Sequence, residues 1–373
     1  MNFLPCAISN SKLISLAHSI IHNIPALILG AFGIGIVMAI HEYGHFIFGK
    51  LFNAYMPNFS LGFGPKLFKY TYGETTYSLS IIPIGAYVEF SNDETASGGH
   101  ERTLEKKSYW QKMLILSGGI LCNLLFAYSI FVGLSLTGIP ATPLLNQNNT
   151  YFVNKVLENS CAQKAQIQAH DRIITFNNIP VDTSLKALFE TIAQLANQTV
   201  PVLIQRDGQL IELTITVDSK IENQKKRGWL GVEFACDPIA PVSFTQALIQ
   251  AGFIEITLIK NTFTGIKHAF IKKSASQFSG PLMMISLISH SAKQGLKLFL
   301  LLLAVISVGL AVLNMLPLPV LDGGNALIYT IQALIGRPLN TTVHNIIYLS
   351  CAALLALFFI YITYKDALTL FFN

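Results

Sequence analysis

Four stretches of the chain combine apolar residues with an almost complete lack of charge. No Asp, Glu, Lys or Arg occurs between Leu13 and His41, between Met113 and Asn154, or between Pro338 and Tyr364. From Leu298 to Gly336, Asp322 is the only charged residue. Each stretch exceeds the roughly 20 apolar residues that cross a bilayer as a helix. The pattern predicts membrane-spanning helices at about 24–48, 113–136, 298–316 and 343–364.

The segments between these helices are more polar and have different periods. Residues 76–90 alternate and are rich in β-branched and aromatic side chains, which predicts a strand or hairpin. The segment 151–218 predicts a compact β-rich domain, with strands at 151–157, 172–176, 200–206 and 210–217 and helices starting at 160 and 185. We interpret 220–227 as a polar linker, 228–234 as a closing strand and 241–291 as amphipathic helices on a membrane surface.

Composition supports a polytopic membrane protein. Hydrophobic residues make up 52% of the chain and charged residues 12%, against about 25% in soluble domains. The mean hydropathy is +0.50. The net charge of +5 is spread without a basic stripe, which argues against a nucleic-acid partner. The five cysteines form no CxxC spacing and are interpreted as small apolar residues.

Charged residues also predict the orientation of the chain. The short segment 51–111 holds five Lys or Arg residues and is flanked by Lys50 and Lys112, so the positive-inside rule places it in the cytoplasm. Both termini and the 151–218 domain then fall on the other side. The first apolar run continues to Phe48 without a clean cleavage site, so we expect it to be retained.

The candidate chemistry begins with the sequence His41-Glu42-Tyr43-Gly44-His45. Two histidines four positions apart lie on one face of a helix, so their ring nitrogens can converge on one Zn²⁺, while the Glu between them can take a proton from a water on the metal. The alternative is a pair of polar helix residues that neighbouring backbone satisfies. An ionisable Glu at membrane depth is costly, which favours the zinc interpretation.

A catalytic zinc needs a third protein ligand and an open position. Asp322 is the natural candidate, because it is the only charge in its apolar window and two prolines and two glycines surround it in the run 314–324. Irregular backbone at membrane depth is tolerated only where it lines a cavity. The predicted topology also places Asp322 at the depth of His45. Asp322 could instead cap a helix that starts near Gly323, and the two roles are compatible.

Several motifs together resemble one protein family. They are the HExxH run, Asn314-Met-Leu-Pro-Leu-Pro-Val-Leu-Asp-Gly-Gly324, Phe59-Ser-Leu-Gly-Phe-Gly-Pro65, Pro83-Ile-Gly-Ala-Tyr-Val88 and a PDZ-like domain at 151–218. The chain is similar, from about Ile24 onward, to the site-2 protease family of intramembrane zinc metalloproteases. Within that family it resembles the bacterial regulator of sigma-E protease (RIP metalloprotease) group.

The resemblance implies a role for each matching residue. His41, His45 and Asp322 would be the zinc ligands, Glu42 the general base, and Asn314 a polar group near the scissile carbonyl. A strand holding Gly85, Ala86, Tyr87 and Val88 would dip into the membrane and pair with an extended substrate.

The resemblance also implies partners and location. Substrates would be single-pass transmembrane proteins, such as an anti-sigma factor in a stress response or a remnant signal peptide. The enzyme would be a multi-pass protein of the bacterial inner membrane in contact with lipid, with its active site near the cytoplasmic face and the PDZ-like domain on the periplasmic side.

The expected fold is a polytopic α-helical membrane protein with about four transmembrane helices, a membrane-associated β-hairpin and an inserted PDZ-like β-rich domain. Its expected segments are 1–50, 51–111, 112–140, 151–218, 219–297 and 298–373. The chain departs from the family pattern in having Ala86 where a second glycine is usual, in lacking a proline between Gly119 and Asn123, and in showing one PDZ-like copy. These departures touch substrate handling, packing and regulation, and leave the metal residues intact.

Two other functions are compatible with membrane histidines. A metal transporter would need further acids along a path through the membrane, and the predicted helices show none. An inactive adaptor with a PDZ-like peptide reader would be expected to have lost a residue of the set His41, Glu42, His45 and Asp322, and all four are present. The substrate and the oligomeric state stay open.

Overall fold

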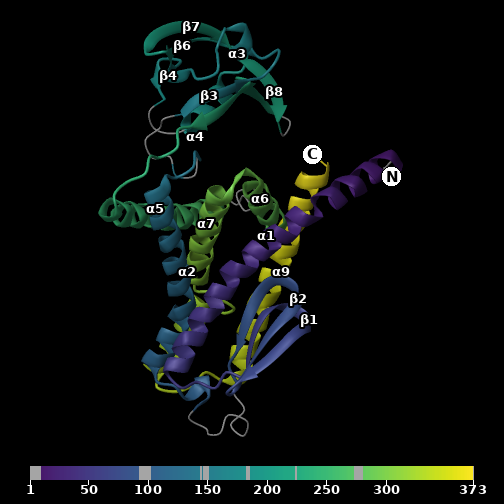
Figure 1. Cartoon of the computed structure of the whole chain (residues 1–373), viewed down its shortest axis with the longest axis vertical. Helices are drawn as coiled ribbons and strands as arrows, with labels where there is room; N and C mark the ends of the chain where they lie inside the picture. The colour runs from purple at the N-terminus through teal and green to yellow at the C-terminus, as the bar shows by residue number, and fades with distance from the viewer. Residues whose placement is uncertain are drawn as a thin grey trace. The chain divides into compact units, whose positions relative to one another are not determined.

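The computed structural model describes residues 10–91, 102–142, 145, 151–181, 185–222, 225–272 and 280–372 (Figure 1). These residues divide into two compact units. Unit 1 comprises Met1–Leu136 and Ser243–Asn373, and unit 2 comprises Thr137–Val242. Each unit is described separately below.

Unit 1 is mainly helical. Its elements are α1 (Asn10–Leu51), β1 (Asn58–Tyr72), β2 (Thr75–Glu89), the 3₁₀ turn η2 (Leu104–Lys106), α2 (Tyr109–Thr137), α5 (Phe244–Lys272), α6 (Pro281–Gln294), α7 (Leu296–Asn314), α8 (Asp322–Ile335) and α9 (Thr341–Phe372). Among the described residues, four helical segments are long and apolar enough to cross a membrane: Ile28–Leu51, Tyr109–Thr137, Leu296–Asn314 and Thr342–Thr369. The four predicted spans are therefore confirmed as helices of sufficient length and apolar character.

Helix α1 is the centre of unit 1. It packs against α6, α7 and strand β2 (Figure 1). It also approaches α2 at two glycines, because a methyl group on either Gly44 or Gly118 would collide with the backbone of the other helix. Small residues let the backbones of membrane helices come close, and here they bring the His41–His45 turn against α2.

Strands β1 and β2 form the hairpin beside α1 (Figure 1). Residues 58–61 at the start of β1 pair with two parts of β2: they run antiparallel to Ala86–Glu89, whereas their partners in Thr76–Leu79 follow the same direction as β1. The predicted strand at 76–90 is β2. Its partner β1 was not predicted as a strand, because glycines at 62 and 64 with positive φ interrupt the alternation.

Unit 2 is β-rich. It contains β3 (Tyr151–Val156), α3 (Cys161–Lys164), β4 (Arg172–Phe176), β5 (Ile179–Pro180), α4 (Leu185–Gln194), β6 (Thr199–Arg206), β7 (Gln209–Thr216), β8 (Asp218–Glu222), β9 (Lys225–Trp229) and β10 (Val232–Cys236). One sheet has the order β5-β4-β6-β7, and β10 pairs with β3 and β8 with β9. The buried core includes Val153, Phe176, Val202, Ile204 and Ile215. The predicted strands and helices of 151–218 match these elements within a few residues.

The predicted linker at 220–227 is wrong, since β8 and β9 form an antiparallel hairpin there. The predicted closing strand at 228–234 is divided, because β9 ends at Trp229 and β10 begins at Val232. A polar hairpin lacks the hydrophobic alternation that marks a strand. Its position depends instead on tertiary packing: a methyl group on Gly228 would collide with the Ile192 carbonyl of α4.

Candidate metal centre

His41 and His45 lie one turn apart on α1, inside a predicted membrane span. Both are buried, with 7% and 6% of their surface exposed. Their rings are perpendicular, with centroids 4.7 Å apart, and their Nε2 atoms are 3.2 Å apart. Nδ1 of His45 lies 2.8 Å from the Ile115 carbonyl oxygen of α2. Because a carbonyl can only accept, Nδ1 carries a proton, and in the neutral imidazole Nε2 then keeps a free lone pair.

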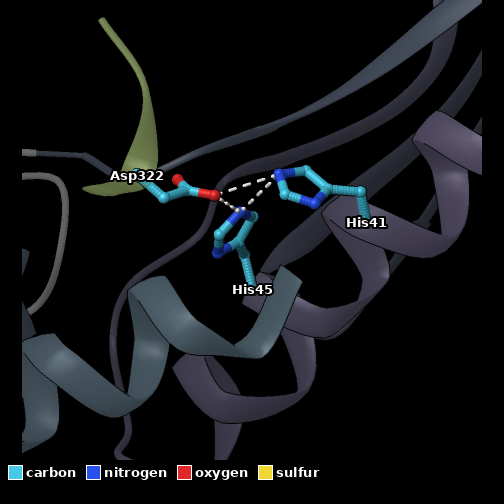
Figure 2. Close-up of side chains that lie close together, drawn as sticks. All are labelled: His41, His45 and Asp322. Atoms are coloured by element: carbon cyan, nitrogen blue, oxygen red, sulfur yellow. Dashed lines mark hydrogen bonds and ion pairs between the residues drawn. The ribbon is translucent and has the colours of Figure 1, made fainter. Parts of the chain in front are cut away.

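Asp322 reaches the histidines from the other half of unit 1. Its Oδ2 lies 3.1 Å from Nε2 of His41 and 3.4 Å from Nε2 of His45. Figure 2 shows the carboxylate turned toward both rings. The break between α7 and α8 permits this approach. A methyl group on Gly323 or Gly324 would collide with backbone of residues 315–319, so only glycine lets the chain fold back so closely.

The alternative role of Asp322 as a helix cap is wrong. The N-cap of α8 is Leu321, no side chain caps the helix, and Asp322 is the first helical residue. The Asp322 side chain is turned toward the histidines instead of its own backbone (Figure 2).

The donor set fits a zinc ion. One ligand atom from each of His41, His45 and Asp322 can be chosen so that all three lie within 4.8 Å of one another. Oδ2 of Asp322 is buried and makes no hydrogen bond to any described residue. A carboxylate oxygen facing two imidazole lone pairs is a costly arrangement unless a cation joins them. Two imidazoles, one carboxylate and an open fourth position are the ligands of a catalytic zinc.

Two asparagines flank His41. Nδ2 of Asn314, at the end of α7, lies 3.3 Å from Nε2 of His41, and Nδ2 of Asn123, on α2, lies 3.4 Å from Nδ1. Oδ1 of Asn123 has no hydrogen-bond partner among the described residues. With the amide turned so that Oδ1 faces the ring, Asn123 would accept the Nδ1 proton and leave Nε2 of His41 as a ligand.

Sequence reasoning did not assign roles to two residues of α2 at the site. Asn123 is fully buried in the charge-free stretch of α2 that follows Lys112, and that polar position was the available signal. Gly119 forms the floor beneath the rings, because a methyl group there would lie 2.5 Å from Nε2 of His45. No pattern in a single sequence distinguishes such a glycine from an ordinary helix-packing glycine.

Glu42 faces the hairpin. Its Oε2 accepts the backbone N–H of Val88 at 3.0 Å. Val88 pairs with Phe59 on the other side of β2, so its N–H points away from β1 and toward α1. The N–H groups of successive residues along a strand point alternately to its two edges. The N–H of Ala86, two residues before Val88, therefore points the same way as that of Val88.

The remaining residues of the predicted substrate strand lie beside these groups. Ala86 is buried, and the ring of Tyr87 stacks on Phe63 with centroids 6.1 Å apart. Gly85 has φ of +97°, and a side chain there would collide with the Phe63 ring. Glycine at this position therefore permits the bend of β2 against the Phe63 ring.

A helical membrane protein with two histidines and an aspartate converging beside a glutamate is built as a metal-dependent hydrolase of the membrane. Comparison with known proteins identifies the class further. Residues 29–358 match the model of peptidase family M50, and the chain belongs to this family. It is a zinc metallopeptidase of the site-2 protease type, and Zn²⁺ is its cofactor.

Three relatives illustrate the similarity. A protein of Clostridium acetobutylicum named a putative zinc metalloprotease is 28% identical over 91% of this chain and 96% of its own length. A second protein named a putative zinc metalloprotease, from Clostridium perfringens, is 30% identical over 81% of this chain and 86% of its own length. A chloroplastic membrane metalloprotease of Arabidopsis thaliana is 26% identical over 90% of this chain and 77% of its own length.

Proposed function

We propose that the chain hydrolyses a peptide bond inside the transmembrane segment of single-pass membrane proteins, with His41, His45 and Asp322 as the zinc ligands. The proposal rests on the convergence of these three side chains, two from α1 and one from the first residue of α8. The proposed substrates are those of regulated proteolysis, such as an anti-sigma factor or a remnant signal peptide in a bacterial inner membrane.

Zinc bound at these residues would polarise the scissile carbonyl and lower the pKa of the attacking water toward about 7. Glu42 takes the proton from that water and delivers it to the leaving amine. The amide of Asn314 lies beside His41 and donates a hydrogen bond to the oxygen that becomes negative. The buried surroundings of His41 and His45 keep competing water out.

The outer edge of β2 would hold the substrate. A helical peptide bond is shielded by its own hydrogen bonds, so the substrate must unwind locally before it is cut. An extended segment can then pair with Ala86 and its neighbours by backbone hydrogen bonds. The N–H of Val88 already faces Glu42, so a segment on this edge would lie next to the general base.

The deciding experiment compares membranes containing the wild-type enzyme and the Glu42→Gln variant. This variant removes the base and keeps all three ligands. Proteomics should find fragments cut within a transmembrane segment only with the wild type, while both enzymes retain zinc. Turnover of Glu42→Gln above a few per cent of wild type would contradict the role of Glu42. If the wild-type enzyme cleaves other proteins but leaves transmembrane segments of single-pass proteins intact, the proposed substrate class is wrong.

We also propose that unit 2 acts as a size filter on the far side of the membrane from the zinc. A PDZ-like domain reads peptide termini through a glycine-rich loop of free N–H groups, and this chain has no glycine between Gly138 and Gly208. Deletion of the unit should leave cleavage of a short-tailed substrate intact and permit cleavage of one with a large outer domain. A folded deletion variant that still rejects the large substrate would contradict the filter.

The structure also bears on the alternative of a metal transporter, which would need further acids within the membrane spans. The span Thr342–Thr369 does contain one acid that the predicted helix boundaries left outside, Asp366. Both of its oxygens are used, since they accept the backbone N–H groups of Gly280 and Met283 at 3.2 and 2.9 Å. Asp366 therefore holds the start of α6 and offers no free oxygen to a moving cation.

A further inference from the structure

Unit 1 contains a cavity that the proposed chemistry does not use. It has a volume of about 830 Å³ and is lined by η2, the first turn of α2, the second half of α8 and the start of α9. The candidate spans Tyr109–Thr137 and Thr342–Thr369 both begin at this cavity. A cavity at the ends of two spans lies at the membrane–water boundary. Trp110, which is 73% exposed on the first turn of α2, suits the same depth.

The lining is positively charged. It includes Lys106, Lys112 and Arg337, and among the described lining residues Glu105 is the only carboxylate. None of the three cations forms an ion pair within the described parts of the chain. The charge of the cavity is therefore about +2 without a contribution from His344. Such a concentration of unpaired cations in a cleft attracts a phosphate group.

Contacts with aromatic side chains shape one wall of the cavity. The ammonium of Lys112 lies over the Tyr329 ring, 4.8 Å from its centroid. The hydroxyl of Tyr109 lies 3.2 Å from that of Thr330, which joins α2 to α8. These contacts give the cavity a formed wall, and Arg337 at the end of α8 can grip a phosphate through two N–H groups.

The surroundings distinguish a lipid from a free anion. Exposed apolar side chains adjoin the cavity on both helices that border it: Leu334 and Ile335 on α8, which are 83% and 52% exposed, and Ile346 on α9, which is 59% exposed. A soluble phosphate would gain nothing from them, whereas acyl chains would cover them. The volume is also large enough for a phosphoglycerol group.

We propose that this cavity binds the head group of an anionic phospholipid, with Lys106, Lys112 and Arg337 on the phosphate and the acyl chains along α8 and α9. Basic pockets between membrane helices commonly hold such head groups. The bound lipid would join α2, α8 and α9 at the membrane surface. Asp322, a proposed zinc ligand, is the first residue of α8. The lipid would therefore hold the C-terminal half of the same helix.

The test uses the full-length enzyme in phosphatidylcholine nanodiscs titrated with phosphatidylglycerol, with bound lipid measured by native mass spectrometry. Lys112→Gln combined with Arg337→Gln should weaken binding about 10- to 30-fold, because each cation near the surface contributes about fivefold. The matched control is Lys260→Gln with Lys267→Gln, which removes two exposed lysines of α5 that are not among the lining residues and should leave the saturable binding unchanged.

A second variant, Ala333→Trp, fills the cavity and keeps every charge. It should also abolish the saturable binding, with zinc content and elution volume reporting on its fold. Equal losses in the pocket and control variants would reduce the effect to general surface charge and overturn the proposal. Displacement of the lipid by millimolar inorganic phosphate would overturn it in favour of a soluble anion. Zinc content and cleavage are measured separately, so failure of this site leaves the proposed function untouched.

Discussion

Asp171 of unit 2 and Asp322 of unit 1, whose side chain is 15% exposed, differ in how their carboxylate oxygens are satisfied. In unit 2, Asp171 is fully buried and accepts the Gln168 N–H at 2.7 Å. Its two oxygens also accept Nε and Nη2 of Arg206, each at 2.7 Å. In unit 1, Oδ2 of Asp322 is buried without a hydrogen bond to any described residue and faces two imidazole nitrogens.

The difference separates structure from chemistry. A buried carboxylate with all its hydrogen bonds made stabilises the fold around it, and breaking it leaves an uncompensated charge. A buried carboxylate oxygen without a donor costs free energy unless something absent from the polypeptide supplies the positive charge. The charge of Asp171 is therefore balanced by Arg206 within the protein, whereas the carboxylate of Asp322 requires a bound cation.

The largest expected effect is that of Asp322→Ala. Removing one of three ligands should eliminate zinc and lower turnover by about 10³-fold or more, since metal catalysis contributes several kcal/mol. Zinc is measured by elemental analysis of the purified enzyme and turnover on a model substrate. The matched change at the other aspartate, Asp171→Ala, should leave the zinc content at the wild-type level. Full zinc occupancy in Asp322→Ala would remove the distinction between the two residues.

Asn314→Ala should have the next largest effect. Loss of one donor to the developing oxyanion costs about 10²–10³-fold in rate, and zinc should stay bound because Asn314 is not a ligand. Asn123→Ala is the informative partner, as it contacts the other nitrogen of the same ring and should lower zinc affinity about 10- to 100-fold. An unchanged rate in Asn314→Ala would leave that residue a purely structural role at the end of α7.

Asp171→Asn tests the structural half of the comparison. It removes the counter-charge of the Arg206 guanidinium, which keeps its hydrogen bond to the Gln166 carbonyl, and the expected loss is about 3–5 kcal/mol of stability. Thermal unfolding of the full chain should show an earlier transition with zinc still bound. The control is Arg172→Gln, which breaks the pair with Asp237; both partners are more than 40% exposed, so it should cost under about 1 kcal/mol. Equal losses in the two variants would show that burial does not decide the strength of these pairs.

The sequence predicted those features that depend on residues close together along the chain. The membrane helices follow from runs without charge, the strands β4, β6 and β7 from alternation, and the HExxH spacing placed His41, Glu42 and His45 on one turn. Asp322 came from a single charge in an apolar window. The parts that were missed depend on contacts between distant segments.

Strand β1, the β8–β9 hairpin and the roles of Gly119 and Asn123 belong to this second group. Gly119 matters because two rings from α1 pass over it, and Asn123 matters because of the position of Nδ1 of His41. Neither contact leaves a periodic trace in the sequence around it. Asp366 was misjudged for a related reason, since its place in the last span depends on where α9 ends.

Glu255 of α5 provides the smallest and most discriminating test of the comparison. Its side chain is 9% exposed, and Oε1 has no hydrogen-bond partner among the described residues, as with Asp322. No other metal-binding side chain of the described chain groups with it, however. Burial raises the pKa of the Glu255 carboxyl from 4.5 to about 7, so a proton can satisfy this group where Asp322 needs a metal.

The sign of the effect follows from linkage. Below pH 4.5 the carboxyl is protonated in both folded and unfolded chains, and its ionisation costs nothing. Between pH 4.5 and about 7 the unfolded chain loses the proton first, so stability falls by up to about 3 kcal/mol and then levels off. Glu255→Gln should therefore match wild type at pH 4.5 and be the more stable protein at pH 8. Glu212→Gln, an exposed position on β7, should show no such divergence. If Glu255→Gln raises the free energy of unfolding equally at both pH values, the ionised carboxylate is not the cause of the difference.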